Sequence, residues 1–232
     1  LVERPLPLNE GLLEPVEIVL EEGLFAPPFG AALDFADARQ APAVVGGNVE
    51  TSQRLVNALL AALSAMAYSQ GTMNNLLFGN ARFGFYETIC GGVGATEEAD
   101  GASAVHSHMT NTRSTDVEIL ETRYPVRLER FARRRGSGGA GRRRGGDGVI
   151  RAFTFLEELS LSLLGQHRTA GPRGLHGGLP GAPAVVSFIP SEGTPRSLGA
   201  SAALDVKAGD ELVLETPGGG GYGAPPQARR VS

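Results

Sequence analysis

Two histidines one residue apart, His106 and His108, are the first candidates for chemistry in this 232-residue chain, which has only four histidines. They stand in the stretch HSHMTNTRSTD (106–116). Alternate side chains of a strand point to the same face, so a strand here would bring both imidazoles together. With a carboxylate such as Asp100 or Asp116, the pair suits a divalent metal or proton transfer. The alternative is that both histidines are structural and bond to the backbone.

Polar residues beside this pair suit the binding of a small molecule. Asn111, Thr112 and Arg113 follow directly, and short polar groups next to a guanidinium can orient an amide or a carboxylate. The alternative is a network of turn-forming side chains that holds the loop. Glu87, in YETICGG (86–92), lies among aromatic and apolar residues, where a partly buried carboxylate can act as a general base. Pairing with an arginine is an equal alternative for Glu87.

Residues 130–148 are rich in arginine and glycine. An RNA-binding segment, a solvated linker and an ordered turn that holds an anion are three interpretations of such a segment. No aromatic residue lies between Arg133 and Gly148, which argues against stacking on RNA bases, and the strand-like residues after Gly148 favour order. In an ordered turn the arginines would face an anion or an acidic partner. The residues of this anion or interface loop are Arg142, Arg143, Arg144 and Asp147.

The composition is typical of a globular chain rather than of a nucleic-acid binder. Hydrophobic residues make up 41% and the net charge is −4, so the basic segment belongs to an acidic body. Cys90 is the single cysteine and cannot form an internal disulfide; we interpret it as buried and inert. No apolar run approaches the roughly 18 residues that span a bilayer, and we expect a cytoplasmic protein with no membrane partner. The chain begins with Leu in a Pro-rich stretch, and we expect it to be the later part of a longer protein.

One amphipathic helix, at about residues 48–66, is the clearest predicted element. Asn48 is expected to cap it, since Asn accepts from the free N–H groups of a first helical turn. Its apolar residues recur at helical spacing. They form one stripe: Leu55, Leu59, Ala62, Leu63 and Met66.

The rest of the chain reads mainly as strands and loops. Residues 29–47 are predicted as an irregular connection and 69–80 as turns, and 117–132 begin as a short helix or strand. We therefore predict an α+β, β-rich fold with mixed sheets and long glycine-rich loops, in one unit (1–232) that ends in a flexible tail (224–232). The predicted strands are a strand or hairpin at 12–28, one at 82–92, β-type residues within 148–168, and two at 198–223 joined by a turn at 208–210.

Five stretches follow one another along the chain: SQGTMNN (69–75), YETICGGVGA (86–95), HSHMTNTRSTDVEILETRYPV (106–126), GSGGAGRRRGGDG (136–148) and TPGGGGYG (216–223). Together they resemble the C-terminal half of the B-type subunit in the hydantoinase B/5-oxoprolinase family, from about Leu6 to Gly223. The resemblance implies that the Arg/Gly segment is an ordered family element. The pattern departs from the family at Gln166-His167 and at Gly171.

The resemblance implies an ATP-dependent hydrolase that opens a cyclic amide such as a hydantoin or 5-oxoproline. An A-type partner subunit would bind ATP and Mg²⁺ and phosphorylate the amide oxygen, while this chain would help to enclose the intermediate and activate water. TPGGGG (216–221) lacks the Lys and Ser/Thr of a P-loop, so we predict no nucleotide site in this chain. In this picture the candidate catalytic residues, chosen above from their own chemistry, are His106, His108, Asp116 and Glu87, with a divalent metal at the two histidines; the candidate substrate-binding residues are Asn111, Thr112 and Arg113.

Three other functions stay open at this point. A non-catalytic assembly subunit would dock its glycine-rich loops on the A-type chain and use its histidines structurally. A B-type subunit of an ATP-dependent ketone carboxylase would carry the same five stretches. RNA binding through the arginines would show a salt-sensitive affinity, but the family resemblance predicts no nucleic-acid partner.

Overall fold

The computed structural model describes residues 14, 17, 19, 47–108 and 110–226. The chain divides into two units, residues 1–47 and 48–232, and the second unit contains all the strands named below. The predicted strand or hairpin at 12–28 and the connection at 29–47 lie outside the described residues, apart from single positions. Most of the predicted tail also lies outside them, and the single unit over 1–232 stays a prediction.

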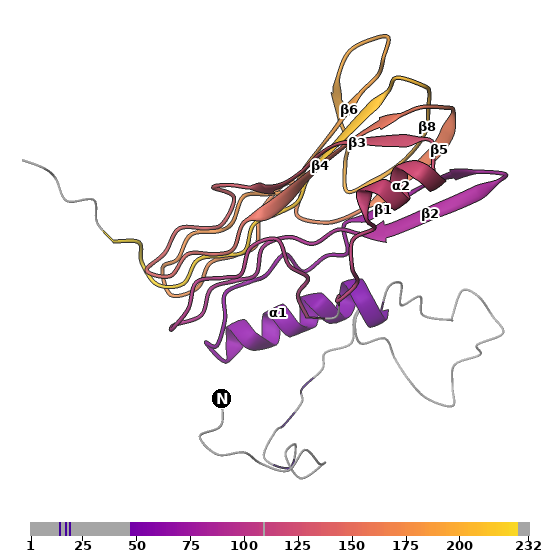
Figure 1. The fold of residues 1–232 in the computed structure, drawn as a ribbon. Helices are drawn as coiled ribbons and strands as arrows, with labels where there is room; N and C mark the ends of the chain where they lie inside the picture. Colours follow the sequence, from indigo (N-terminus) through magenta and orange to yellow (C-terminus); the bar gives the residue numbers. More distant parts are fainter. Residues whose placement is uncertain (1–13, 15–16, 18, 20–46, 109, 227–232) are drawn as a thin grey trace, which may run out of the picture. The chain divides into compact units, whose positions relative to one another are not determined.

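Two antiparallel sheets form the framework of the second unit (Figure 1). The four-stranded sheet has the order β2-β1-β5-β8, and the five-stranded sheet has the order β3-β4-β9-β6-β7. Every strand pair is antiparallel, and the predicted β-rich α+β class is confirmed. The strands are β1 (Asn75–Asn80), β2 (Phe83–Thr88), β3 (Val126–Arg134), β4 (Gly148–Phe155), β5 (Leu159–Leu164), β6 (Val185–Ile189), β7 (Arg196–Ser197), β8 (Ser201–Val206) and β9 (Glu211–Glu215); α2 (Val117–Arg123) precedes β3.

A single apolar core takes side chains from both sheets. On β5 the buried Leu159, Leu161 and Leu163 alternate with the exposed Ser160, Ser162 and Leu164, as expected for a strand with one buried face. Phe78 of β1 stacks on Phe85 of β2, with ring centroids 4.5 Å apart, and meets Phe155 of β4 edge-on at 6.0 Å. These aromatic contacts join the two sheets across the core.

The predicted helix is present, with different ends. α1 spans Ser52–Ala62 and follows a π-helical turn, η2 (Gly47–Thr51). Its N-cap residue is Thr51 rather than Asn48, so the predicted cap is wrong. Met66 lies beyond the helix, in an isolated bridge with Thr96.

The amphipathic helix α1 turns its polar side toward the protein. Leu55 and Leu59 are 67% and 56% exposed, whereas Gln53 and Asn57 are 0% and 1% exposed. An apolar stripe ordinarily faces a core. In α1 the face that packs against the rest of this unit instead carries the amide side chains of Gln53 and Asn57. Other polar side chains of the unit therefore lie beside this face of the helix.

Extended glycine-rich segments lie side by side in a bundle, and backbone hydrogen bonds join them to one another (Figure 1). In residues 218–223 the N–H donors follow a three-residue period. Gly218 and Gly221 donate to residues 182 and 179 of one segment, while Gly219 and Tyr222 donate to residues 146 and 143 of another. A three-residue turn is the period of the polyproline II helix, which makes no internal hydrogen bonds. Neighbouring segments therefore supply the partners that the backbone requires.

Glycine is required in this bundle because backbones pass too close for a side chain. A Cβ at Gly219 would collide with the carbonyl oxygen of Val93, and one at Gly146 would collide with that of Ala102. The Arg/Gly segment (130–148) includes the end of β3 and the loop that connects β3 to β4. The middle part of this loop is one of the segments of the bundle. The prediction that this segment is ordered is confirmed, and the solvated-linker interpretation is wrong.

Several predicted strands are present, and one turn prediction is wrong. Residues 82–92 contain β2, residues 148–168 contain β4 and β5, and residues 198–223 contain β8 and β9, although these last two strands lie in different sheets. The second half of 69–80, predicted as turn-forming, is β1. The region 117–132 is a short helix, α2, followed by β3. Across the described ranges, no helix combines the length and apolar character needed to cross a membrane.

Candidate functional site

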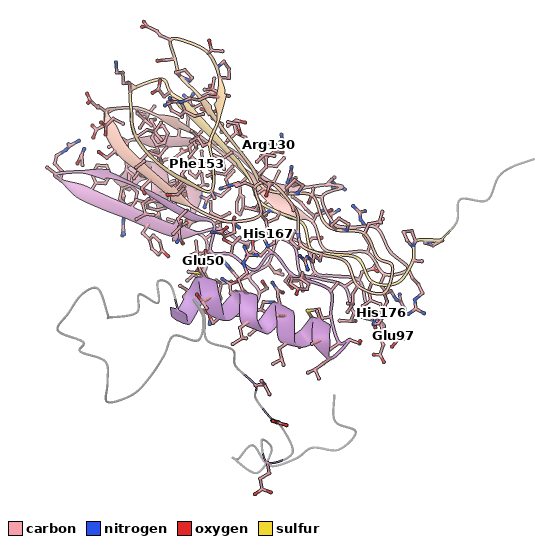
Figure 2. All side chains as sticks on the ribbon, turned by 180° about the vertical axis from the view of Figure 1, so that it is seen from behind. Glu50, Glu97, Arg130, Phe153, His167 and His176 are labelled. Atoms are coloured by element: carbon pink, nitrogen blue, oxygen red, sulfur yellow. The ribbon has the colours of Figure 1, made fainter. Side chains whose placement is uncertain are left out.

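A layer of polar side chains lies against the inner face of α1, and we call it the polar layer. Figure 2 shows Glu50 at the start of this helical region and His167 between the helix and the strands. Its members come from four separate parts of the chain. Hydrogen bonds of Glu50, Arg54 and Asn57 join the helical region to the other three parts, and His106, Ser107 and Arg168 are included as sequence neighbours of the bonded histidines. They are Glu50, Gln53, Arg54 and Asn57 of η2 and α1; Ser69, Gln70, Thr72 and Asn74 before β1; His106, Ser107 and His108 of the following loop; and His167 and Arg168 after β5.

Glu50 ties the start of the helix to the segment before β1. Its Oε1 accepts from Thr72 Oγ1 at 3.0 Å and from the Met73 N–H at 2.7 Å. Thr72 Oγ1 in turn accepts from the Gln166 N–H at 3.0 Å. This chain of bonds connects the helix, the entry to β1 and the exit from β5.

Asn57 fixes the orientation of His108. The Ser69 N–H donates to Asn57 Oδ1 at 2.9 Å, and Asn57 Nδ2 donates to the Ser69 carbonyl at 3.3 Å. Since Oδ1 can only accept, His108 Nε2, 2.8 Å away, carries the proton and donates. Gly71, at φ +51°, leaves the space that the Asn57 amide occupies, because a Cβ there would collide with Nδ2.

His167 is held as a neutral imidazole by Arg54. A guanidinium can only donate, so Arg54 Nη1 donates to His167 Nε2 at 3.1 Å, and His167 Nδ1 donates to the Ala170 carbonyl at 3.0 Å. Burial, together with the charge of Arg54, lowers the pKa of His167 from 6.5 to about 4. Burial also lowers the pKa of Arg54. His167 is therefore an acceptor for a buried cation rather than a proton carrier at neutral pH.

His106 is the member of the layer best suited to proton transfer. Its Nε2 lies 3.5 Å from Thr112 Oγ1, which lies 2.5 Å from Thr88 Oγ1 at the end of β2. Its Nδ1 is buried and meets no hydrogen-bond partner in the described part of the chain. Burial lowers the pKa values of both His106 and His108, which favours the unprotonated form at neutral pH. In the tautomer that carries its proton on Nε2, the Nδ1 lone pair of His106 is free to accept a proton.

Buried polar atoms without a partner are concentrated in this layer. Buried polar groups are almost always hydrogen-bonded, so a group of exceptions marks a place where water, a ligand or a partner supplies the bonds. Arg168 reaches the layer near Gly165, where a Cβ would lie 3.3 Å from Arg168 Nη2 and 3.2 Å from Asn74 Oδ1. Among the described residues, Glu87 Oε1 and three nitrogens of Arg151 are also without a hydrogen bond, but they belong to a buried ion pair. The atoms in the polar layer are Glu50 Oε2, both amide atoms of Gln53, Gln70 Nε2, His106 Nδ1, Ser107 Oγ and Arg168 Nε.

Glu87 pairs with an arginine, which is the alternative to its role as a general base. The ion pair with Arg151 crosses the core from β2 to β4, and both side chains are buried. The Arg151 guanidinium lies 5.0 Å from the ring centroids of both Phe131 and Phe153. Glu87 Oε2 accepts from the Thr115 N–H at 3.0 Å. Burial lowers the pKa of Arg151 to about 10, so it stays charged, and the pair anchors the loop that follows His108.

The two histidines do not lie on a strand, the arrangement that would have brought their rings to one face. His106 and His108 lie in a loop, His108 has φ +54°, and the two rings contact different partners. Asp116 is the N-cap of α2, where Oδ1 accepts from the N–H groups of Glu118 and Ile119. Nowhere in ranges 47–108 and 110–226 do three or more His, Cys, Asp or Glu side chains gather to hold a metal ion. The catalytic and metal roles of these residues stay predictions.

The other predicted site residues are exposed or hold neighbouring loops in place through hydrogen bonds and ion pairs. Asn111 and Arg113 are exposed in the loop after His108. Asp147 is buried, accepts from the Gly138 N–H at 2.9 Å and pairs with Arg144 at 3.2 Å, so it pins the Arg/Gly segment. The remaining loop arginines, Arg142 and Arg143, are exposed; Arg142 pairs with Glu97 at 3.4 Å. Cys90 is buried, and burial raises the pKa of its thiol.

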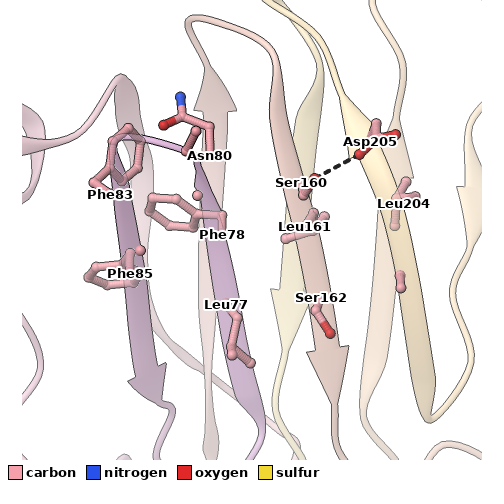
Figure 3. A pocket seen from close by; sticks show the side chains of 14 residues that line it. Leu77, Phe78, Asn80, Phe83, Phe85, Ser160, Leu161, Ser162, Leu204 and Asp205 are labelled. Atoms are coloured by element: carbon pink, nitrogen blue, oxygen red, sulfur yellow. Dashed lines mark hydrogen bonds between the residues drawn. The ribbon is translucent and has the colours of Figure 1, made fainter.

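A separate hollow of about 770 Å³ lies on the four-stranded sheet (Figure 3). Its polar groups include Ser160 Oγ and Asp205, which bond to each other at 2.9 Å. The predicted catalytic residues do not line it. We therefore place the candidate site in the polar layer rather than in this hollow.

Sequence reasoning missed much of the polar layer. Gln53 and Asn57 stand four residues apart on the helix, opposite the leucine stripe, which is a pattern that normally indicates a solvated face. Gln70 and Asn74 were covered by a turn prediction, and His167 was noted only as a departure from the family pattern. One feature of the sequence could have indicated the polar layer: SQGTMNN contains three amide side chains, Gln70, Asn74 and Asn75.

Comparison with known proteins identifies the family. The hydantoinase B/oxoprolinase description matches residues 1–225. The 5-oxoprolinase of Dictyostelium discoideum is 44% identical over 224 residues, and 5-oxoprolinase 1 of Arabidopsis thaliana is 47% identical over 224 residues; these matches cover 96% and 97% of this chain but 17% of each relative. A crystal structure of the ATP-dependent caprolactamase from Pseudomonas jessenii matches with a TM-score of 0.62 and 25% identity, over 75% of this chain and 33% of that one. The predicted resemblance is confirmed: the chain belongs to the hydantoinase B/oxoprolinase family.

Proposed function

We propose that this chain forms part of an ATP-dependent hydrolase that opens a cyclic amide of the hydantoin or 5-oxoproline type. The observation that carries the proposal is the buried, unpartnered Nδ1 of His106, together with the unpartnered polar atoms of Gln53, Gln70, Ser107 and Arg168 in the polar layer. The names of the oxoprolinase relatives and of the caprolactamase support this reaction class. An A-type partner subunit would supply ATP and Mg²⁺, as family membership suggests.

The reaction needs a base for water, because an unstrained amide carbonyl is a poor electrophile even after its oxygen is activated. In the proposal His106 Nδ1 takes a proton from the water that adds to the ring carbonyl carbon, and returns it to the ring nitrogen as the C–N bond breaks. Since the carbonyl oxygen carries the phosphoryl group, this step leaves an acyl phosphate, and a second water releases inorganic phosphate and the free carboxylate. The step requires the tautomer with its proton on Nε2, where the Thr112 hydroxyl, 3.5 Å away, can accept it. A well-placed general base of this kind contributes roughly 10²–10⁴-fold to the rate.

The other unpartnered groups supply the complementary contacts. Gln70 Nε2, Ser107 Oγ and Arg168 Nε are donors, and a tetrahedral intermediate carries oxygen charge that such donors stabilise. Gln53 offers both a donor and an acceptor, which is the complement of a lactam with one C=O and one N–H. His108 holds its place through Asn57 and acts as a positioning residue.

The test is the substitution His106→Gln in the assembled, ATP-hydrolysing enzyme that contains this chain. We expect the kcat for opening 5-oxoproline, measured as glutamate formed, to fall by about 10²–10⁴-fold, with unchanged assembly and an unchanged thermal midpoint. His176→Gln is the matched control, since His176 is exposed and lies beside Tyr222 of the glycine bundle, outside the polar layer. Full turnover by the His106 variant would refute the catalytic assignment.

A non-catalytic assembly subunit is the second candidate, and the exposed leucines of α1 favour it. Leu55, Leu59 and Leu63 present an apolar ridge to solvent, which is typical of a surface covered in an assembly. The same experiment separates the two functions. Unchanged turnover in the His106 variant, with lost assembly in a Leu59→Glu variant, would support the assembly role alone.

A further inference from the structure

The free edge of the five-stranded sheet carries a groove rich in arginine. β3 is the first strand of that sheet and pairs with β4 on one side; in the described part of the chain its other side pairs with no strand. The groove has a volume of about 480 Å³. Its lining consists of Arg130, Ala132, Arg133, Arg134, Arg135, Ile150 and Glu215.

The floor and the edge of this groove differ in character. Ala132, Ile150 and Glu215 stand opposite one another on β3, β4 and β9, so they form one row across the outer face of the sheet. The arginines follow the edge strand beside this row. An extended segment lying along β3 would therefore meet a partly apolar floor on one side and guanidinium groups along its length.

The carboxylates nearest to this edge are already occupied. Glu129 binds Arg127 at 2.6 Å and accepts from Thr154 Oγ1 at 2.7 Å. Asp147 binds both Arg133 and Arg144, and Glu215 binds Arg134 at 3.4 Å.

Two arginines of the groove remain uncommitted. Arg130 and Arg135 are exposed and have no ion pair among the described residues. Since the whole chain has a net charge of −4, this concentration of positive charge is local. Arginine forks recognise carboxylates through paired, charge-assisted hydrogen bonds.

We propose that the groove along β3 binds an extended, carboxylate-rich segment of another protein chain. The charge complementarity comes from Arg130 and Arg135. Backbone groups of β3 that are not already bonded offer further hydrogen bonds; the Leu128 N–H donates to Glu121, and the Arg133 and Arg134 carbonyls accept from Arg135 and Ser137. Arg142 and Arg144 do not line the groove, and their side chains are engaged by Glu97 and Asp147. The groove is therefore a more specific interaction site than the arginine–glycine segment as a whole, and it does not depend on the proposed hydrolase activity.

The test measures binding of a fluorescein-labelled hexaglutamate peptide to the full chain by anisotropy, at low and at physiological salt. We expect binding at low salt that weakens as salt screens the charges. The double substitution Arg130→Glu with Arg135→Glu is expected to weaken binding at least about tenfold, since it reverses both uncommitted charges. The matched control is Arg143→Glu with Arg173→Glu, which makes the same change of charge at exposed arginines outside the groove.

Each remaining outcome overturns the proposal. Absence of peptide binding at low salt would do so directly. Equal losses in the two double variants would show a response to net charge rather than to the groove. A single-stranded oligouridine that binds more tightly than the peptide, and loses its affinity in the groove variant, would assign the surface to nucleic acid instead. Thermal midpoints of all variants confirm that the fold is retained in each comparison.

Discussion

Protonation of His167 is predicted to destabilise the protein as the pH falls below neutrality. A proton on Nε2 would remove the acceptor for Arg54 and place two cations in contact. The pKa of His167 is about 4 in the folded protein and near 6.5 in the unfolded chain. Because the unfolded state binds the proton first, this contribution to stability is complete above pH 6.5 and is lost as the pH falls towards 4.

The size of the effect follows from the difference between the two pKa values. A difference of about 2.5 corresponds to about 3 kcal/mol of unfolding free energy over the whole range, and about 2 kcal/mol of it is lost by pH 5. Burial also lowers the pKa values of His106 and His108, and these two groups add to the loss in the same direction. The charged groups of the polar layer are Arg54, Arg168 and Glu50. The measured change of unfolding free energy with pH includes their influence.

The assay is urea unfolding at pH 7.5, 6 and 5 of the unsubstituted chain, His167→Asn and His176→Asn. Asn suits both positions, because His167 and His176 have φ values of 58° and 49°, a region that Asn tolerates. His167→Asn is expected to lose about 2 kcal/mol less than the unsubstituted chain between pH 7.5 and 5. His176→Asn retains His167 and should keep the full slope. Equal slopes for the unsubstituted chain and His167→Asn would refute the reasoning.

Three further substitutions test the framework by chemical denaturation. Glu87→Gln leaves Arg151 buried without a counter-charge, and we expect a loss of about 3–5 kcal/mol; a loss below 1 kcal/mol would contradict this. Gly219→Ala places a Cβ against Val93 and should cost at least about 1–3 kcal/mol. Its control is Gly84→Ala, where a Cβ meets nothing within 4 Å, and equal effects would reject the steric argument. Asp116→Ala removes the cap of α2 and should cost about 1 kcal/mol.

The strands that could be predicted are those with a local signal. β2, β8 and β9 combine alternation or β-type residues with flanking turns, and these features survive in any tertiary context. β1 could not be predicted well, because its first residues continue a polar, Asn-containing stretch. Its strand conformation depends on pairing with β2 and β5, which lie on its two sides in the sheet. Such pairing is a property of the whole fold rather than of the local sequence.

The helix was predictable, but the environment of its faces was not. The leucine pattern shows one stripe and cannot show which side is covered. Gln53 and Asn57 are buried because the glycine-rich segments beneath α1 offer backbone groups and little apolar surface. Asn57 shows this directly, since it bonds both the N–H and the carbonyl of Ser69.

The candidate site was predicted by residue type and missed in its geometry. The rule that alternate residues share a face applies to strands, and His106 and His108 lie in a loop. The partner of His108, Asn57, is 51 residues away in the chain, so no local spacing could indicate it. Asp116 and Glu87 have the right chemistry for catalysis, but a helix end and a buried guanidinium occupy their carboxylates.

The bundle of glycine-rich segments has a consequence for how the molecule opens. Residues 218–223 bond in turn to segments around residues 68, 143–146, 175 and 179–182, so this stretch cannot leave without breaking contacts with all of them. Local fraying, which exposes loops and chain ends in most proteins, is not available to it. The amide protons of Gly219 and Gly220 should therefore exchange with deuterium only when the whole unit unfolds, at rates as slow as those of the central strands.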